Sequence, residues 1–419
     1  MKALFLLASF GAAAVPVWEA PLEIAAGRGD KGPWRQNASR YDYVDDATVA
    51  GAGAAAAGGG HLVAWADQKG RDVWLRHISA DGRAGAAVNV SRSPATFSWL
   101  PRIAVDPARA GRVYLLWQEI IFSGGSHGGD ILFAASHDGG QTFAAPRNLS
   151  RSTGGDGKGR LDRRTWSNGS LDLAVGADGT LFAAWTEYHG ALWLARSRDG
   201  GAAFSAPRRI AGDDARPARG PSLAPEPGGI LHLAWSVGEH PQAAIRVATS
   251  RDNGASFAAP RLVGAGEGRL DAPRLAFAGG RLHLVYARQR VRGAASDIRY
   301  TSAADSHFGS ARTLSAGGAA YPMLAGDGGI GLAVVWENMS ADGRAQSLGL
   351  VRSADAGRSF SPPSAVPGSA ALPGGSNGSQ QGLLGQKLAF GRDGSIAIVN
   401  SSLQPGVRSR IWLMRSSDP

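Results

Sequence analysis

Carboxylate and arginine side chains stand at points where this repetitive sequence becomes irregular, and such residue types can recognise sugars. Four carboxylates lie just beyond the aromatic residue of a strand-like run, namely Asp67, Glu119, Glu187 and Glu337. Three arginines, Arg102, Arg274 and Arg288, occur in or near similar runs. Guanidinium groups bind carboxylate or sulfate in a bidentate way, and convergent charged groups define a candidate site. We therefore expect these residues to line one polar pocket, although a single surface carboxylate is more often solvated.

A repeated turn motif is the element that would hold such residues in place. The stretch SHDGGQTF at 136–143 returns as SRDGGAAF from Ser197, SRDNGASF from Ser250 and SADAGRSF from Ser353. The Asp carboxylate can accept backbone N–H groups across a tight turn, and Gly supplies a positive φ. We expect a hairpin turn at each copy. Because the Asp recurs in unit after unit, we assign it to the turn rather than to acid catalysis or calcium binding.

The spacing of this motif predicts the fold. Copies begin 61, 53 and 103 residues apart, and the last interval contains a weaker copy at Ser302. Traces at Ser79 and Ser416 bring the count to seven units of about fifty residues, the length of a propeller blade. Each unit reads as four antiparallel strands with alternating and β-branched residues. The predicted blades span 44–93, 99–151, 166–212, 220–264, 270–315, 320–366, and 385–418 together with 16–25.

The N-terminal strand is expected to close the last blade of this all-β, seven-bladed β-propeller. Trp18-Glu19-Ala20-Pro21 repeats the pattern that follows each turn motif, whereas Ser416 to Asp418 is the first half of a motif. Joining the two removes the sheet edges that would otherwise face solvent. Deleting residues 16–25 should therefore open the blade.

Four-stranded blades place all the turn motifs on one face and the loops that enter the inner strands on the other. The irregular segments on this second face are 26–43, 118–130, 151–168, 287–297 and 364–384. Long insertions on one face indicate binding, so this face is the candidate site. The aromatic residues of the second strands recur in nearly every blade. We therefore expect them to pack between blades rather than to stack on sugars.

Composition narrows the class of protein. The 419-residue chain has 60 Gly, 22 Pro, no Cys and a formal net charge of +10, which comes mainly from Arg. Short apolar runs with this much Gly and Pro favour strands over helices, and the absence of Cys excludes disulfides and thiolate metal sites. The arginines are scattered without a basic run, which excludes a nucleic-acid footprint. They reflect either a compositional bias or affinity for acidic ligands.

Residues 1–14 have the features of a secretory signal. Lys2 precedes an apolar stretch, and Ala12-Ala13-Ala14 offers a small-residue cleavage site. The stretch is too short for a membrane span, and no later segment reaches the required apolar length. We expect an exported protein, secreted or periplasmic, with one propeller domain over 15–419 and no integral membrane segment.

The motif SxDxGxxF is identified as the Asp-box, or BNR repeat, and its four good copies make most of the chain resemble the sialidase superfamily. In that family arginines bind the substrate carboxylate, and a tyrosine nucleophile is served by a carboxylate base, an exception to the two-carboxylate scheme. By this resemblance LPRIAVDP gives Arg102 the role of first arginine. The segment AYPMLAGDGGIGLAVVWEN places the nucleophile at Tyr321 and its accompanying acid at Glu337. The segment LDAPRLAFAGGRLHLVYAR places the base at Asp271 and the second arginine at Arg288.

The resemblance implies one activity, and the residues leave others open. It implies a monomeric exo-glycosidase that acts on acidic sugars, or a propeller that recognises them, with no cofactor. Sialidases have six blades and this chain is predicted to have seven, so a non-catalytic ligand-binding or assembly propeller of the cell envelope is the alternative. A lyase on uronate polysaccharides, with His189 as base, is a third. No grouping of His and carboxylates has the spacing of a metal site.

Overall fold

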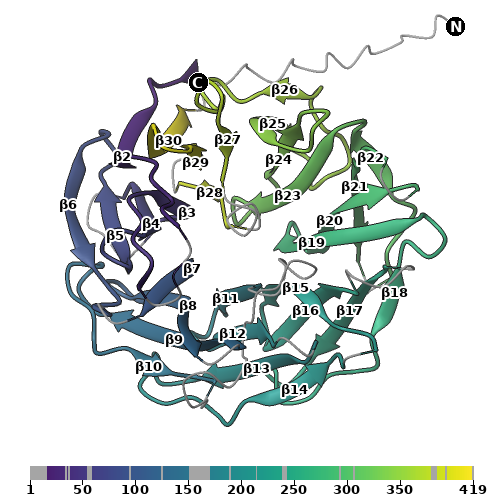
Figure 1. Cartoon of the computed structure of the whole chain (residues 1–419). Coiled ribbons are helices and arrows are strands. Elements are labelled where there is room, and N and C mark those ends of the chain that lie inside the picture. The colour runs from purple at the N-terminus through teal and green to yellow at the C-terminus, as the bar shows by residue number, and fades with distance from the viewer. Residues whose placement is uncertain are drawn as a thin grey trace, which may run out of the picture.

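Seven antiparallel sheets surround a central channel in the computed structural model, which confirms the predicted seven-bladed propeller (Figure 1). The structure describes residues 17–33, 35, 38–53, 59–93, 96–123, 126–150, 170–187, 190–213, 215–237, 243–291, 294–304, 307–378, 385–391 and 394–417, without the side chains of 121–129 and 417. In these residues no helix has the length and apolar character that a membrane crossing would need. His189 and the whole of loop 151–168 lie outside the described residues.

The strands of blades 1 to 6 run from the channel outward in chain order. Blade 1 comprises β3 (Val44–Gly51), β4 (His61–Asp67), β5 (Asp72–Ile78) and β6 (Ala84–Asn89). Blade 2 comprises β7 (Phe97–Val105), β8 (Val113–Ser123), β9 (Ser126–Ser136) and β10 (Arg147–Asn148). Blade 3 comprises β11 (Leu171–Val175), β12 (Leu181–Thr186), β13 (Leu192–Ser197) and β14 (Arg208–Ala211).

The next three blades repeat this arrangement, close to the predicted ranges. Blade 4 comprises β15 (Arg219–Glu226), β16 (Ile230–Ser236), β17 (Ile245–Ser250) and β18 (Arg261–Val263). Blade 5 comprises β19 (Arg269–Ala278), β20 (Arg281–Gln289), β21 (Asp297–Ala303) and β22 (Arg312–Ser315). Blade 6 comprises β23 (Ala319–Gly326), β24 (Leu332–Met339), β25 (Ala345–Ser353) and β26 (Ser364–Ala365).

The seventh blade joins the two ends of the chain, as predicted. On its channel side β27 (Ser376–Asn377) and β28 (Leu388–Phe390) pair with β29 (Ile396–Gln404), which pairs with β30 (Arg408–Ser417). On the outer side β1 (Val17–Trp18) and β2 (Leu22–Gly27) pair with β30. Ile24 is buried in the core, and Arg408 forms an ion pair with Glu23 at 2.6 Å. The N-terminal segment therefore closes the ring, while Asp418 lies outside the described residues.

The core of the molecule lies between blades rather than at one centre. Seven hydrophobic clusters each combine buried residues of two adjacent blades. In one of them Trp117 of blade 2, which is fully buried, packs with Leu62 and Leu75 of blade 1. The other second-strand aromatics are buried in the same way, which confirms that they pack between blades: Trp65, Trp185, Trp235, Tyr286 and Trp336.

The repeated motif forms the predicted turn between the third and fourth strands. Ser136 Oγ donates to Asp138 Oδ1 at 2.7 Å and accepts from Gly140 N at 2.9 Å, and Asp138 Oδ1 accepts from Thr142 N at 2.9 Å. Gly139 has φ 78° and Gly140 has φ 89°, which a side chain would resist. Although partial burial acts to raise it, these hydrogen bonds lower the pKa of Asp138 to about 2.

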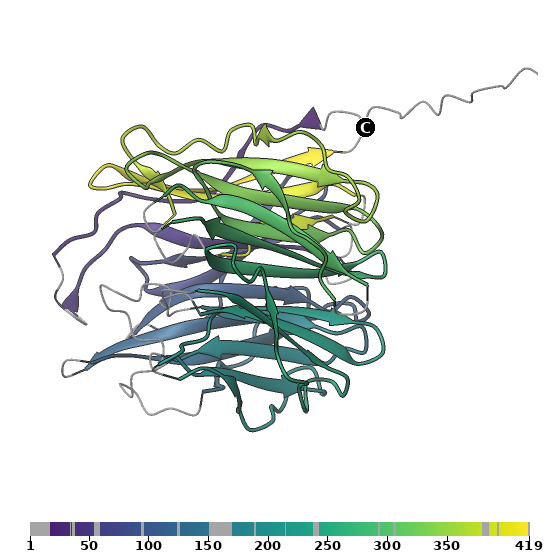
Figure 2. The ribbon, with the colours of Figure 1, turned by 90° about the vertical axis from the view of Figure 1, so that its right-hand side faces the viewer.

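The two faces of the ring differ in outline. The turns just described lie on one face, and the segment between β2 and β3 projects from the opposite one, drawn in purple in Figure 2. The long hairpin of β8 and β9 rises on the same side as that segment, since it joins a second to a third strand. The loop-rich face predicted from the sequence is therefore where irregular elements gather.

Candidate functional site

Each inner strand presents one side chain to the central channel at an equivalent position. In six blades this residue pairs with the residue that precedes the second-strand aromatic, and in blade 7 its carbonyl accepts a hydrogen bond from Val399 N at 2.9 Å. We call these the channel positions. In blade order they are Thr48, Arg102, Asp172, Ser222, Arg274, Met323 and Lys387. The equivalent position of the seven blades thus carries six different residue types, since only Arg occurs twice.

A β-bulge directly before the channel position aims these side chains. In five blades the pairing register shifts there, and a residue with positive φ lies two positions ahead of the channel residue. These residues are Asp46, Leu100, Gly220, Ala272 and Tyr321, with φ from 51° to 58°. Except in blade 1, a proline follows, because its ring suits a position without a ladder hydrogen bond. Bulges re-aim side chains in this way, and four non-glycine residues here accept backbone strain.

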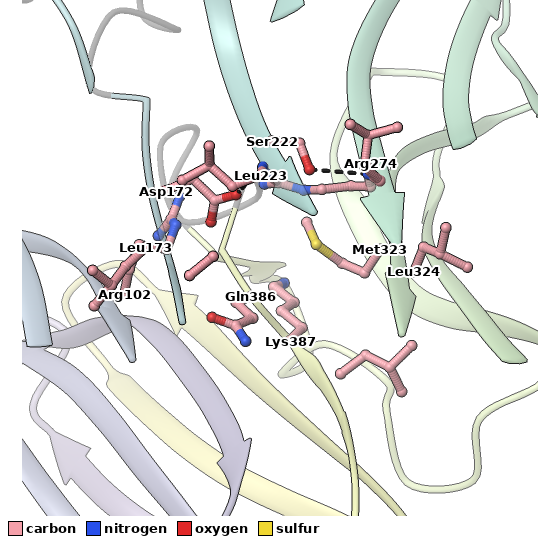
Figure 3. A pocket seen from close by; sticks show the side chains of 13 residues that line it. Arg102, Asp172, Leu173, Ser222, Leu223, Arg274, Met323, Leu324, Gln386 and Lys387 are labelled. Carbon is pink, nitrogen blue, oxygen red and sulfur yellow. Dashed lines mark hydrogen bonds between the residues drawn. The ribbon is translucent and has the colours of Figure 1, made fainter. Parts of the chain in front are cut away.

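Six of the seven channel positions, all except Thr48, line a cavity of about 220 Å³. Figure 3 shows Arg102 and Asp172 on one side, Arg274 and Met323 on the other, and Lys387 below them. The remaining lining comes from the channel residue Ser222, from Gln386 and from residues that follow channel positions: Leu173, Ala174, Leu223, Leu275, Leu324 and Leu388. Three cations and one carboxylate therefore line a cavity that is large enough for a sugar.

Electrostatics in this cavity favour an anion. Arg102 is 2% exposed, and burial together with the nearby Arg274 lowers its pKa to about 10, while Asp172 and Asp46 act in the opposite direction. Arg274 has its pKa lowered by burial as well. Burial raises the pKa of Asp172, against the effect of Arg274 and of the hydrogen bond from Leu223 N at 2.7 Å. Both guanidinium groups stay protonated at neutral pH and repel each other.

Lys387 is the third cation, and it links the cavity to a buried carboxylate. Its Nζ forms an ion pair with Glu337 Oε1 and donates to Asn400 Oδ1 at 3.1 Å. Asn400 in turn donates to the Ser369 carbonyl at 3.2 Å. Lys387 and Glu337 are 2% and 1% exposed, so the pair is shielded from water. Burial without such a partner would be costly for either charge.

Tyr321 lies beside two of the acids that the sequence assigns to it. Burial raises the pKa of its phenol, and the carboxylates of Asp271 and Glu337 raise it further, whereas Arg269 lowers it. Asp271 Oδ1 accepts hydrogen bonds from Ser236 Oγ and from its neighbour Ala272 N, both at 2.8 Å. Tyr321 lies two residues ahead of the channel residue Met323 and is close enough to both predicted acids for their charges to act on its phenol, but none of these three residues is among those that line the cavity.

The other predicted site residues lie outside the cavity. Arg288 forms ion pairs with Asp297 and, at 3.8 Å, with Glu267. Glu119 is buried and accepts hydrogen bonds from Trp117 Nε1 at 2.9 Å and Ser98 Oγ at 3.0 Å.

Two more of the predicted carboxylates stand at turns. Asp67 caps the turn that follows β4, because its Oδ1 accepts from Lys69 N at 2.9 Å and Gly70 N at 3.2 Å. Glu187 follows β12 directly, and its backbone carbonyl accepts from Arg219 Nη1 at 3.0 Å. Of the seven residues expected in one pocket, only Arg102 and Arg274 line it, and Glu337 reaches it through Lys387.

Sequence reasoning missed Asp172, Ser222 and Lys387, although a signal for them exists. The inner strands share the pattern of a channel residue followed by Val, Ile or Leu and then Ala, as in PRIA, LDLA, PSLA, PRLA, PMLA and QKLA. Aligning these runs identifies the channel position of every blade. The same alignment shows that the three fragments resembling sialidase segments are copies of one inner strand, so their likeness to each other comes from the repeat.

Among the residues that the structure describes, no three His, Asp or Glu side chains gather closely enough to hold a metal ion. His232 and His283 occupy matching positions in β16 and β20. His232 bonds Glu226 Oε2 at 2.8 Å, and His283 bonds Tyr300 Oη at 2.8 Å. Both imidazoles therefore take part in side-chain packing within their own blades.

Comparison with known proteins recovers the fold. No family model and no curated protein matches the sequence. A GH93 α-L-arabinofuranosidase of Fusarium graminearum, solved with arabinobiose, superposes with a TM-score of 0.51 at 14% identity, over 76% of this chain and 92% of that one. A protein of unknown function from Dyadobacter fermentans gives a TM-score of 0.50 at 12% identity, over 77% and 95%.

A Hadza microbial sialidase, Hz136, gives a TM-score of 0.49 at 14% identity, over 70% of this chain. The chain spans 63% of the length of that sialidase, less than two thirds. At these identities the likeness concerns the fold alone. The two superpositions with TM-scores of 0.51 and 0.50 agree with the β-propeller fold that the sequence predicts.

Proposed function

We propose that the protein binds an acidic sugar in the central cavity and hydrolyses its glycosidic bond as an exo-acting glycoside hydrolase. The observation that carries the proposal is the pair of guanidinium groups, Arg102 and Arg274, that line one cavity of about 220 Å³, where burial and repulsion from Arg274 lower the pKa of Arg102. A bound carboxylate would relieve this repulsion and accept charge-assisted hydrogen bonds. Asp172 is the only carboxylate among the lining residues and leaves an excess of positive charge.

In this proposal Tyr321 attacks the anomeric carbon, and Asp271 accepts the phenolic proton. A neutral phenol suits an anionic substrate because a carboxylate nucleophile would be repelled by it. Ser236 and the backbone of Ala272 hold Asp271 in place through the two hydrogen bonds of 2.8 Å. The bond to the aglycone breaks as the tyrosyl bond forms, and the departing oxygen takes a proton from solvent. Water then attacks the anomeric carbon of the tyrosyl intermediate and loses a proton to solvent, while the released phenolate recovers its proton from Asp271.

The test uses aryl glycosides of sialic acid and glucuronic acid, with aryl glucoside as the neutral comparison. We expect fluorophore release from an acidic substrate and its loss, by 100-fold or more, in Tyr321→Phe. Tyr114→Phe is the matched control, since Tyr114 is a buried tyrosine that packs in the hydrophobic cluster between blades 2 and 3. Undiminished turnover in Tyr321→Phe, or release from the neutral glucoside alone, would overturn the catalytic part of the proposal.

Recognition without hydrolysis is the second candidate, and one observation favours it. Burial raises the pKa of Tyr321, and the adjacent Asp271 and Glu337 raise it further, which makes the phenolate harder to form. A binding propeller would show saturable affinity for the acidic sugar in calorimetry and no product after prolonged incubation. Replacing the cavity arginine in an Arg102→Met variant would abolish binding of the acidic sugar whether or not the protein hydrolyses it.

We further propose that the protein is exported as a monomer after removal of residues 1–14. The composition of that segment supports the proposal, and the segment lies outside the described residues. N-terminal sequencing of protein recovered from the periplasm or medium should begin after Ala14. A mature chain that still begins at Met1, or a light-scattering mass of twice the chain mass, would contradict it.

A further inference from the structure

A projecting segment of the loop-rich face lies between β2 and β3. Its described residues 28–33, 35 and 38–43, together with the turn at 67–71, form what we call the basic arm. Gly29 N donates to the Asp42 carbonyl at 2.8 Å, which pins the two ends of the segment together. Arg71 Nη2 donates to the Ser39 carbonyl at 3.1 Å and fastens the arm to blade 1. Figure 2 shows the arm standing out from the ring.

Positive charge predominates on the basic arm. Its described residues include six cationic side chains and three carboxylates. The cations are Arg28, Lys31, Arg35, Arg40, Lys69 and Arg71, and the carboxylates are Asp30, Asp42 and Asp67. All the cations except Arg71 are exposed, and burial together with Arg40 lowers the pKa of Arg71. Lys69 forms an ion pair with Asp42 at 3.4 Å, and the six cations and three carboxylates leave a net charge of +3 on the described residues of the arm.

Aromatic rings are interleaved with these charges. The Tyr41 ring lies 5.7 Å from Tyr43 and 6.0 Å from Phe97, and Phe97 lies 6.4 Å from Trp99. Lys31 stands over the Tyr43 ring at 5.4 Å. Phe97 is buried, but Tyr41, Tyr43 and Trp99 keep part of their surface exposed. Rings of this kind offer apolar faces to sugar C–H groups, while neighbouring cations attract acidic substituents.

The basic arm is continuous with the cavity wall. Trp99 and Arg102 are on the same inner strand, β7, with Trp99 at the loop-rich end and Arg102 in the channel. Leu100 N donates to Asp46 Oδ2 at 3.2 Å, which joins β7 to β3 directly below the arm. The carboxylate of Asp46 also acts on both Tyr43 and Arg102. A ligand in the cavity can therefore extend over the arm without crossing a gap between distant blades.

We infer that the basic arm binds the continuing chain of an acidic polysaccharide whose terminal sugar occupies the cavity. This inference rests on the proposed function and extends it, because it makes the substrate a polyanionic glycan rather than a single acidic sugar. Sugar rings lie on Tyr41, Tyr43 and Trp99, and carboxylate or sulfate groups along the chain meet Lys31, Arg35 and Arg40. A surface carrying only charge would suit any polyanion, whereas the aromatic faces favour sugars.

The experiment compares oligogalacturonates of increasing length with galacturonate monomer, using the whole protein in calorimetry at two salt concentrations. The test variant is Lys31→Gln/Arg35→Gln/Arg40→Gln. The matched control changes three exposed cations of the box turns on the opposite face, Arg198→Gln/Arg251→Gln/Arg358→Gln, so that net charge falls equally. We expect affinity to rise at least tenfold from monomer to hexamer in the native protein and to weaken with added salt. The arm variant should lose that gain while its monomer affinity stays the same, and the control should keep it.

Each outcome separates this inference from the proposed function. Equal hexamer and monomer affinity in the native protein, or an unchanged chain-length gain in the arm variant, overturns the arm inference and leaves the cavity proposal standing. No monomer binding, with an arm-dependent hexamer affinity, contradicts the cavity proposal and keeps the arm. Duplex DNA that binds as tightly as a hexamer, with the same dependence on the arm, would show a surface for polyanions in general and overturn the inference.

Discussion

The four box turns and the seven channel positions come from the same repeated blade, yet they differ in what is kept. In the box turns the side chains recur and make the same hydrogen bonds: a serine hydroxyl and an aspartate carboxylate close the turn at Ser136, Ser197, Ser250 and Ser353. In the channel the strand position recurs, with a bulge and a positive φ in five of the blades, while the side chains change from Thr to Arg, Asp, Ser, Met and Lys. The side chains that recur in the box turns are those that every blade needs to fold. The side chains that vary at the channel positions mark the candidate binding site.

The most severe way to break the repeated framework is to remove the strand that closes it. Deleting residues 16–25 strips β30 of its outer partners and removes buried Ile24. We expect the melting temperature to fall by roughly 10 °C or more, because an unpaired edge and an exposed core cost several kcal/mol. Val17→Ala, at a residue 61% exposed, is the control. A melt identical to that of the full chain would refute closure as a source of stability.

The next largest effect tests whether a channel residue also contributes to the stability of the fold. Lys387→Met leaves Glu337 buried without its cation, and removing one member of a buried pair costs about 3 kcal/mol. Adding Glu337→Gln should restore most of that loss, since the uncompensated charge is gone. Urea unfolding of the two variants measures both effects. If Lys387→Met is as stable as the native protein, the ion pair does not support the seventh blade.

A box turn should respond in stability alone. Ser136→Ala removes a hydroxyl that donates to Asp138 and accepts from Gly140 N, at an expected cost of about 1 kcal/mol. Ligand affinity should stay within twofold of the native value, because this turn lies on the face away from the cavity. His137→Ala changes an exposed residue of the same turn and serves as the control. Weakened sugar binding by Ser136→Ala would contradict the prediction that the box turn affects stability alone.

The smallest expected effect concerns the bulge that the channel positions share. Ala272 has φ 51°, a left-handed conformation that costs an L-residue roughly 1 kcal/mol or more. Ala272→Gly should therefore stabilise the protein by about 0.5 kcal/mol after the entropy cost of Gly. Gly220→Ala is the mirror experiment, since the added Cβ would meet nothing closer than 3.7 Å and only φ strain opposes it. Equal and opposite shifts in unfolding free energy would show that strain at the bulge is intrinsic to the fold.

The fold was predictable from the sequence because the same turn motif and the same strand pattern recur along the chain. Four copies of one turn fixed the blade length, and the recurring aromatics Trp117, Trp185 and Trp235 pack between blades as expected. The site was predictable only in part. Arg102 and Arg274 meet in the cavity, but Arg288 is held by Asp297 two strands from the channel, which only strand pairing reveals.

Asp172 and Lys387 escaped notice for a different physical reason. Asp172 lies in the short inner strand β11 and Lys387 directly before the short strand β28, where a charged residue breaks an apolar run, and single-sequence patterns treat such a residue as a surface position. Their convergence depends on the ring closing at seven blades, which is not a local property of the sequence. Aligning the inner strands on their common aliphatic-Ala step would have found both.

The measurement that tests the account most directly is calorimetric binding of an acidic monosaccharide and of its neutral carboxamide to the native protein and to Arg102→Met. Our account predicts that the native protein binds the acid at least 100-fold more tightly than the carboxamide, since each hydrogen bond to a charged group contributes about 1.5–3 kcal/mol. It also predicts that Arg102→Met loses this preference, while its melting temperature reports separately the cost of leaving the buried Asp172 with one cation fewer. Equal affinity for acid and carboxamide, or undiminished acid binding by Arg102→Met, would contradict the assignment of the central cavity as an acidic-sugar site.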